Sequence, residues 1–152
     1  MDIKGERWLP APPEVVWESL HDVDTLRATI PGCKELTQTG ENCFEGSASV
    51  GVGVIKGLYK GGIELTLEEP YSQACLEINA KSGHAEIKGS GEIQLEPSED
   101  GTLVRYQGEA RISGPLAAVG QRLLPSATKS LTESFLKNVE AFLRERAESK
   151  GA

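Results

Sequence analysis

The feature that most constrains the fold is a change in the spacing of apolar residues near Gly114-Pro115. Before it, from Cys33 to Gly114, apolar and polar residues alternate, a period of two that is typical of strands with one buried face. After it, apolar residues recur every three or four positions as far as Phe142, as on one face of a helix. We therefore expect an antiparallel sheet followed by one long helix.

Turn residues divide the alternating region into strands. They cluster at residues 39–42, 69–70, 82–83 and 97–101, and such clusters commonly separate strands. A first strand is expected at Ile3–Leu9, and the prolines after it favour a short helix from about Glu14 to Leu20. Asp22 or Asp24 can cap a second short helix, which Pro31-Gly32 ends. The sheet should have about seven strands.

The final helix is long enough to cross this sheet. Roughly 30 residues at ~1.5 Å each span about 45 Å. Pro125 removes one backbone donor and should bend the helix. The sequence thus predicts an α+β helix-grip fold, in which a curved antiparallel sheet wraps a long C-terminal helix. The 152 residues fit one domain over residues 1–146 with a frayed end at 147–152.

Composition argues against several classes of function. With a net charge of −7, the chain lacks the overall positive charge that nucleic-acid binding requires. Its three cysteines, Cys33, Cys43 and Cys75, are an odd number without CxxC spacing, so neither a disulfide framework nor a metal site is expected. Residues 1–7 carry charges where a signal peptide is apolar, and no apolar run approaches a membrane span. We expect a cytoplasmic protein that can still contact a membrane surface.

The pattern offers little for catalysis. The two histidines, His21 and His84, fall at the end of a short helix and at a turn, where a structural or solvated role is expected. Ionisable residues of the strands, such as Glu64 and Glu77, share the outward parity, so no paired-carboxylate site faces the helix. We expect no catalytic residues and no covalently bound cofactor.

Small residues in the middle of the inward face suggest a cavity between sheet and helix near Pro125. Close packing of the helix on the sheet would also use small residues, and that alternative stays open. An apolar cavity with two tyrosine hydroxyls would suit a hydrophobic ligand that carries a carbonyl group, such as an isoprenoid quinone or another lipid. The expected lining residues are Val50, Val52, Tyr59, Leu65, Ile87, Tyr106, Leu116, Gly120, Leu123, Leu124, Ala127 and Leu131.

Two apolar segments rich in glycine and proline suggest the mouth of this cavity or a surface for docking a partner. We interpret the glycines around position 51 as a bulged, strongly curved strand rather than a phosphate loop, because no helix start follows them. The residues concerned are Ile30, Pro31, Gly32, Gly51, Gly53, Val54, Ile55 and Lys56.

Four motifs resemble those of the CoxG family, which is associated with carbon monoxide dehydrogenase. They are Ala11-Pro12-Pro13-Glu14 with Val16-Trp17, then Ile30-Pro31-Gly32-Cys33, then Val50-Gly51-Val52-Gly53 with Ile55-Lys56-Gly57, and finally Gly120-Gln121-Arg122-Leu123.

The resemblance runs from about Ile3 to Phe142 and implies a START-like, polyketide-cyclase-like fold. It also implies association with molybdenum hydroxylases of the carbon monoxide dehydrogenase type, in their maturation or their attachment to the cytoplasmic membrane. The resulting hypothesis is a non-enzymatic accessory protein that binds a quinone or lipid. The alternatives are a cyclase- or hydrolase-like enzyme on the same fold and an assembly factor with a packed interior.

Overall fold

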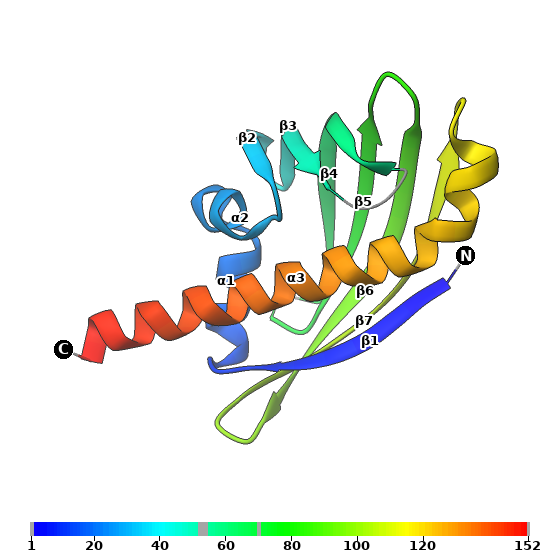
Figure 1. The fold of residues 1–152 in the computed structure, drawn as a ribbon. Helices are drawn as coiled ribbons and strands as arrows, with labels where there is room; N and C mark the ends of the chain where they lie inside the picture. The colour runs from blue at the N-terminus through cyan, green and yellow to red at the C-terminus, as the bar shows by residue number, and fades with distance from the viewer. Residues whose placement is uncertain (1, 52–54, 70, 152) are drawn as a thin grey trace.

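The computed structural model describes residues 2–51, 55–69 and 71–151, and it confirms the helix-grip architecture (Figure 1). A seven-stranded antiparallel sheet in the order β1-β7-β6-β5-β4-β3-β2 curves around a long helix. The strands are β1 (Asp2–Leu9), β2 (Cys33–Gly40), β3 (Cys43–Val50), β4 (Gly57–Glu69), β5 (Gln73–Lys81), β6 (Glu86–Ser98) and β7 (Gly101–Ser113); the helices are α1 (Pro13–Leu20), α2 (Val23–Thr29) and α3 (Ala117–Gly151).

The two short helices begin where the sequence predicts. Pro12 is extended and Pro13 opens α1, a position that tolerates proline because its N–H would have no helical partner. Of the two candidate caps for α2, Asp22 is the one used: the Thr25 amide donates to Asp22 Oδ2 at 3.0 Å. Together the helices close one end of the curved sheet, where Trp17 and Leu20 are buried.

Several glycines of the sheet serve strand curvature rather than open space. A Cβ at Gly61 of β4 would overlap the main-chain oxygen of Asn79 on β5, and one at Gly46 of β3 would overlap the main chain of β2. Gly91 and Gly108 are directly paired across β6 and β7 and are similarly close to the opposite main chain. Much of the glycine that suggested a cavity is therefore consumed where neighbouring strands approach each other closely.

The connection after β3 differs from the expected bulged strand. β3 ends at Val50 and β4 begins at Gly57, whose φ of +149° favours glycine. Gly51 and Lys56 thus belong to a connection between two strands. Val52, Gly53 and Val54 lie outside the described residues.

Helix α3 crosses the inner face of the sheet and bends near Pro125. Figure 1 shows its first turns, drawn in yellow, set at an angle to the orange and red remainder. The expected bend is thus confirmed, with its physical cause in the missing proline N–H. The helical backbone continues to Gly151, and the frayed end at 147–152 stays a prediction.

The buried stripe of α3 is shifted by one residue from the predicted one in its first turns. Gly120 lies against the side chain of Ile112 on β7, closer than a Cβ would allow, and Leu124 one turn later is 2% exposed. Val119 and Leu123, which were expected to face the sheet, are 53% and 40% exposed. Because successive helical residues differ by about 100°, the close approach at Gly120 turns Leu123 toward solvent.

The glycine contacts predict a position-specific effect on stability. Gly61→Ala should lower the free energy of unfolding by about 1–3 kcal/mol, because the added methyl overlaps the main chain of Asn79 and the strands must separate. Gly83→Ala is the matched control, since a Cβ there meets nothing within 4 Å. Urea denaturation of both variants would contradict this account if they proved equally stable.

Candidate ligand-binding site

The interior between the start of α3 and the adjacent end of the sheet is an apolar cluster around Tyr59, here called the Tyr59 cluster. Three parts of the chain far apart in sequence build it: the β3–β4 region, the β5–β6 region, and the end of β7 with α3. Its buried members are Ile55, Tyr59, Ala85, Ala110, Ile112, Leu124 and Ala127, with Ile3, Val50, Ala80, Ile87 and Leu116 packed against them.

The hydroxyl of Tyr59 is the chemically distinctive atom of this cluster. The residue is 4% exposed, and its Oη is buried without a hydrogen-bond partner among the described residues. An unsatisfied buried hydroxyl costs about 1–3 kcal/mol, so such groups are rare and call for an explanation. An acceptor atom of a bound molecule would satisfy it.

The structure brings together half of the predicted lining residues. Val50, Tyr59, Ile87, Leu116, Leu124 and Ala127 all belong to the Tyr59 cluster, and Gly120 packs beside it on Ile112. Leu65 lies in a neighbouring cluster with Leu26, Leu36 and Phe44, and Leu131 is half-buried on α3. Leu123 is on the surface, Tyr106 lies in a separate pocket described below, and Val52 is outside the described residues.

The predicted mouth is divided in the same way. Its two segments do meet, because the Ser49 amide donates to the Gly32 carbonyl at 2.8 Å, and Gly32 has a φ of +70°. Ile30 and Pro31 are half-buried, whereas Gly51 and Lys56 are exposed. Ile55, expected on the surface, is instead 2% exposed in the Tyr59 cluster: its apolar side chain turns inward. Gly53 and Val54 lie outside the described residues.

A pocket of about 250 Å³ between β1 and α3 contains ionisable groups that the sequence reasoning missed. Arg7 shares the inward parity of Leu9, and its Nη2 contacts Glu140 Oε1 of α3 at 3.1 Å. The expectation that strand charges all point away from the helix is therefore wrong for β1. The alternation of β1 is the signal that could have found Arg7. The pocket is lined by Lys4, Gly5, Glu6, Arg7, Tyr106, Lys129, Glu133 and Leu136.

Tyr106 is the titratable group of this pocket with a shifted pKa. Its ring lies over Gly5, where any Cβ would overlap the phenol. Burial raises the pKa of Tyr106, the Glu133 carboxylate raises it further, and the Arg7 guanidinium partly lowers it. The phenol is thus held in its neutral, hydrogen-bond-donating form.

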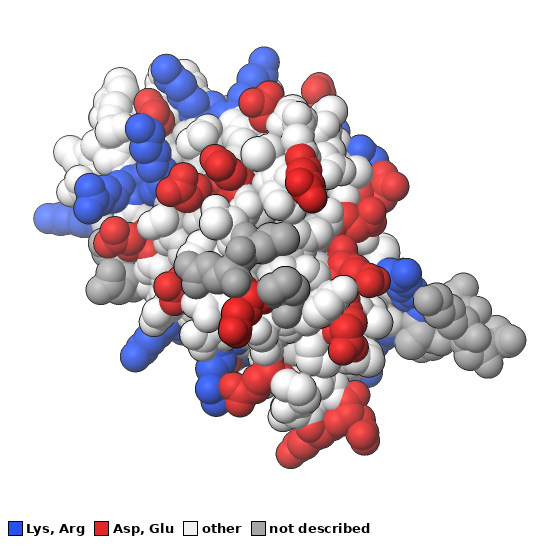
Figure 2. All heavy atoms as spheres, turned by 180° about the vertical axis from the view of Figure 1, so that it is seen from behind, with Lys and Arg blue, Asp and Glu red and all other residues white. Residues whose placement is uncertain are grey.

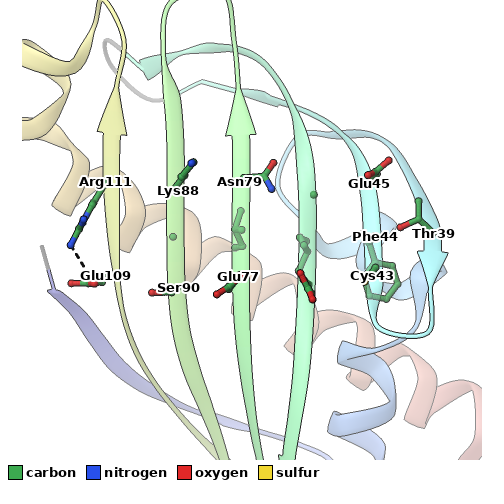
Figure 3. Close-up of a pocket in the computed structure, with 15 residues that line it drawn as sticks. Thr39, Cys43, Phe44, Glu45, Glu77, Asn79, Lys88, Ser90, Glu109 and Arg111 are labelled. Atoms are coloured by element: carbon green, nitrogen blue, oxygen red, sulfur yellow. Dashed lines mark ion pairs between the residues drawn. The ribbon is translucent and has the colours of Figure 1, made fainter.

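The largest hollow on the described surface lies on the outer face of the sheet, away from α3 (Figure 3). Its side chains come from neighbouring strands and are mostly polar, including Glu77, Asn79, Lys88 and Arg111. Arg111 and Glu109 form a loose ion pair of 3.9 Å there. This open polar surface does not suit an apolar ligand.

Comparison with known proteins assigns the chain to a family. The family model for CoxG of carbon monoxide dehydrogenase matches residues 5–144. The chain belongs to the CoxG family.

Solved structures support the same fold. A conserved protein from Geobacillus kaustophilus is 31% identical, with 95% of this chain and 96% of that chain covered and a TM-score of 0.88. Protein CV1439 from Chromobacterium violaceum is 17% identical, with 93% and 95% covered and a TM-score of 0.72. The di-domain ARO/CYC StfQ from the steffimycin biosynthetic pathway is 14% identical, with 97% and 51% covered and a TM-score of 0.71. No curated protein gave a significant match.

In this CoxG-family chain the histidines lie far from the Tyr59 cluster. His21 stacks on Trp17 at 4.7 Å between ring centroids, and its Nδ1 is 2.7 Å from the Trp17 carbonyl oxygen. His84 is exposed in the β5–β6 turn. Over the described residues, no group of three or more His, Cys, Asp or Glu is placed to hold a metal. None of the described helices is long and apolar enough to cross a membrane.

The unpartnered hydroxyl predicts an unusual mutant. Tyr59→Phe should raise the free energy of unfolding of the ligand-free protein by about 1–2 kcal/mol, because it removes a buried donor without leaving a cavity. Tyr71→Phe, at a residue that is 46% exposed, should leave it unchanged. Chemical denaturation compares the two, and a clear loss of stability in Tyr59→Phe would show that the hydroxyl has a partner.

The second pocket predicts a titration. Ultraviolet titration should show a tyrosine component above the ordinary value near 10 that disappears in Tyr106→Phe. Glu133→Gln should lower this pKa only in part, since burial is the larger cause; Glu14→Gln on α1 is the control. Because the folded-state pKa is raised, the associated stability is complete below the unfolded-state value and is lost as pH rises through the folded one. An unshifted component in Glu133→Gln would refute the Glu133 contribution.

Proposed function

We propose that the protein is a non-enzymatic carrier of an isoprenoid quinone or another lipid and serves a molybdenum hydroxylase of the carbon monoxide dehydrogenase type. The observation that carries this proposal is the Tyr59 hydroxyl, a buried donor without a partner among the described residues, inside an apolar cluster. A quinone or ester carbonyl presents the acceptor that this donor lacks, and its hydrocarbon part suits the surrounding aliphatic side chains.

Incomplete cover of the inner face supports binding between sheet and helix. Helix α3 packs mainly on β1, β7 and α2. Ile78 on β5 has the inward parity of Ala74 and Ala80, yet it is 41% exposed, and its cross-strand neighbour Ile63 is half-buried. Apolar side chains on the helix side of β4 and β5 are therefore available to a ligand without unfolding the core.

Family membership supports the choice of partner. The CoxG family is named for carbon monoxide dehydrogenase, and an oxidative hydroxylase has to pass its electrons to an acceptor. A quinone carrier on the cytoplasmic face of the membrane would supply that acceptor and help the enzyme meet the bilayer.

A cyclase- or hydrolase-like enzyme is the second candidate, and one observation favours it. The pocket at β1 places Arg7, Tyr106 and Glu133 together on the helix side of the sheet. A neutral phenol beside a guanidinium could polarise a substrate carbonyl. Turnover of a thioester or polyketide-like substrate that is lost in Tyr106→Phe but retained in Tyr71→Phe would favour the enzyme over the carrier.

The direct test is the ligand itself. Protein purified under gentle conditions is extracted with organic solvent, and the extract is examined for quinones and lipids by mass spectrometry. A stoichiometric quinone or lipid is expected. An empty extract, together with no binding of a short-chain quinone by calorimetry, would overturn the proposal and favour an assembly factor.

The same calorimetry tests the role of Tyr59. Tyr59→Phe should weaken binding of a short-chain quinone about 3- to 10-fold, the value of one hydrogen bond, while the unfolding experiment shows the variant to be at least as stable as the parent. Tyr71→Phe should bind normally. Equal affinities in all three proteins would remove Tyr59 from the site.

A further inference from the structure

Positive charge is concentrated at one end of this acidic protein. Segments 55–62, 80–89 and 111–123 contain one acidic residue, Glu86, although the chain has 23 Asp and Glu against 16 Lys and Arg. We call this end of the molecule the basic end. Its cations are Lys56, Lys60, Lys81, Lys88, Arg111 and Arg122.

The three segments meet in space. Ile55, Ala85 and Ile112, one from each, pack in the Tyr59 cluster, and the Leu116 amide donates to the His84 carbonyl at 3.1 Å. Figure 1 shows the β5–β6 and β7–α3 connections at the upper right. In Figure 2, seen from behind, blue side chains are concentrated at the upper left, and red ones spread over the centre and lower right.

Four of these cations form two like-charge pairs across the sheet. Lys60 is directly opposite Lys81, and Lys88 is directly opposite Arg111. Facing like charges destabilise an antiparallel pair of strands. The nearest carboxylates give little relief, because the Lys88–Glu86 and Arg111–Glu109 pairs are long, at 3.7 and 3.9 Å, and exposed. Fold stability does not account for this arrangement, whereas an anionic surface would.

Exposed aliphatic side chains accompany the cations. Leu58, Val119 and Leu123 are 51%, 53% and 40% exposed, and they are three of the five exposed large hydrophobic residues in the described part of the chain. Leu58 precedes Tyr59 in β4, and the other two lie on the first turns of α3. Single exposed aliphatics need no explanation, but their coincidence with a cluster of cations does.

We infer that the basic end docks on a lipid bilayer that contains anionic lipids, with Leu58, Val119 and Leu123 entering the interface between headgroups and acyl chains. The inference rests on the proposed function, which it deepens by assigning the surface and the lipid charge. Charge complementarity selects this occupant: lysines near an anionic bilayer are attracted to it, and neighbouring aliphatics add apolar contact.

This orientation places the Tyr59 cluster at the bilayer. Ile55, Ala85 and Ile112 belong both to the cluster and to the segments that form the basic end. A hydrophobic ligand leaving the membrane would therefore enter between sheet and α3 by a short path. The acidic remainder of the surface would face away from anionic lipid.

Vesicle co-sedimentation of the full chain tests the inference. Binding is measured to phosphatidylcholine vesicles with and without about 30% phosphatidylglycerol, at low and at physiological salt. Only the anionic vesicles should retain the protein well. Lys60→Gln combined with Lys81→Gln should weaken that binding roughly 25-fold, at about fivefold for each cation near the surface. Lys34→Gln with Lys137→Gln, exposed lysines outside the basic end, should leave binding unchanged.

The aliphatic contribution is tested separately. Val119→Ser with Leu123→Ser should weaken binding to anionic vesicles without changing its dependence on salt. Circular dichroism and thermal unfolding establish that the variants are folded; removing the Lys60–Lys81 repulsion should not lower stability.

The outcomes separate this inference from the proposed function. Wild-type vesicle binding by both double variants would overturn the docking surface, yet leave ligand binding intact if short-chain quinone still binds. Charge-dependent vesicle binding by a protein that binds no quinone or lipid would support docking and overturn the carrier. Equal binding to neutral and anionic vesicles would also overturn the inference, as would variants that lose only binding to a partner enzyme.

Discussion

The close approach of neighbouring main chains at glycines is the constraint on which the rest of the structure depends. At Gly46, Gly61 and Gly108 the space that a Cβ would need is occupied by the adjacent strand. Strands can come this close only where side chains are absent, and three such positions on β3, β4 and β7 allow the sheet to curve around α3. The curvature then determines where the helix touches the sheet and where it does not.

Helix α3 follows from that curvature. It can approach β7 closely at Gly120, where Ile112 occupies the place of a side chain, and Pro125 bends it there. Farther along, Val139 and Leu143 anchor it beside α1 at the opposite end. Between these two anchors the inner faces of β4 and β5 are only partly covered, as Ile78 shows. The uncovered strip thus arises from geometry rather than from any one residue.

Most of the architecture can be predicted from the sequence, because each element has a local cause. Alternation indicates the strands, Asp22 caps α2, and Pro125 bends α3. What the pattern does not resolve is rotation about the helix axis: Leu123 and Leu124 are adjacent apolar residues, and only the contact of Gly120 with Ile112 selects Leu124 for burial. Ile55 is misplaced for a similar reason, since a glycine-rich connection has no period that indicates the direction of its side chain. Arg7 is an error of a different kind, because its parity with Leu9 is visible in the sequence itself.

The two polar features of the inner face have opposite electrostatic characters. Arg7 and Tyr106 are engaged: the guanidinium contacts Glu140 of α3, and the phenol responds to Glu133 and Arg7. These groups tie the edge strand β1 to the middle of the helix. Tyr59, in contrast, is surrounded by aliphatic side chains, and its hydroxyl has no partner in the described part of the chain. A hydroxyl kept in that state makes the empty protein less stable than a phenylalanine would, and a molecule that brings its own acceptor recovers the difference as binding free energy. That coupling between a local deficit in the empty fold and affinity for a carbonyl-bearing apolar molecule gives the interior a chemical selectivity that its size and hydrophobicity alone would lack.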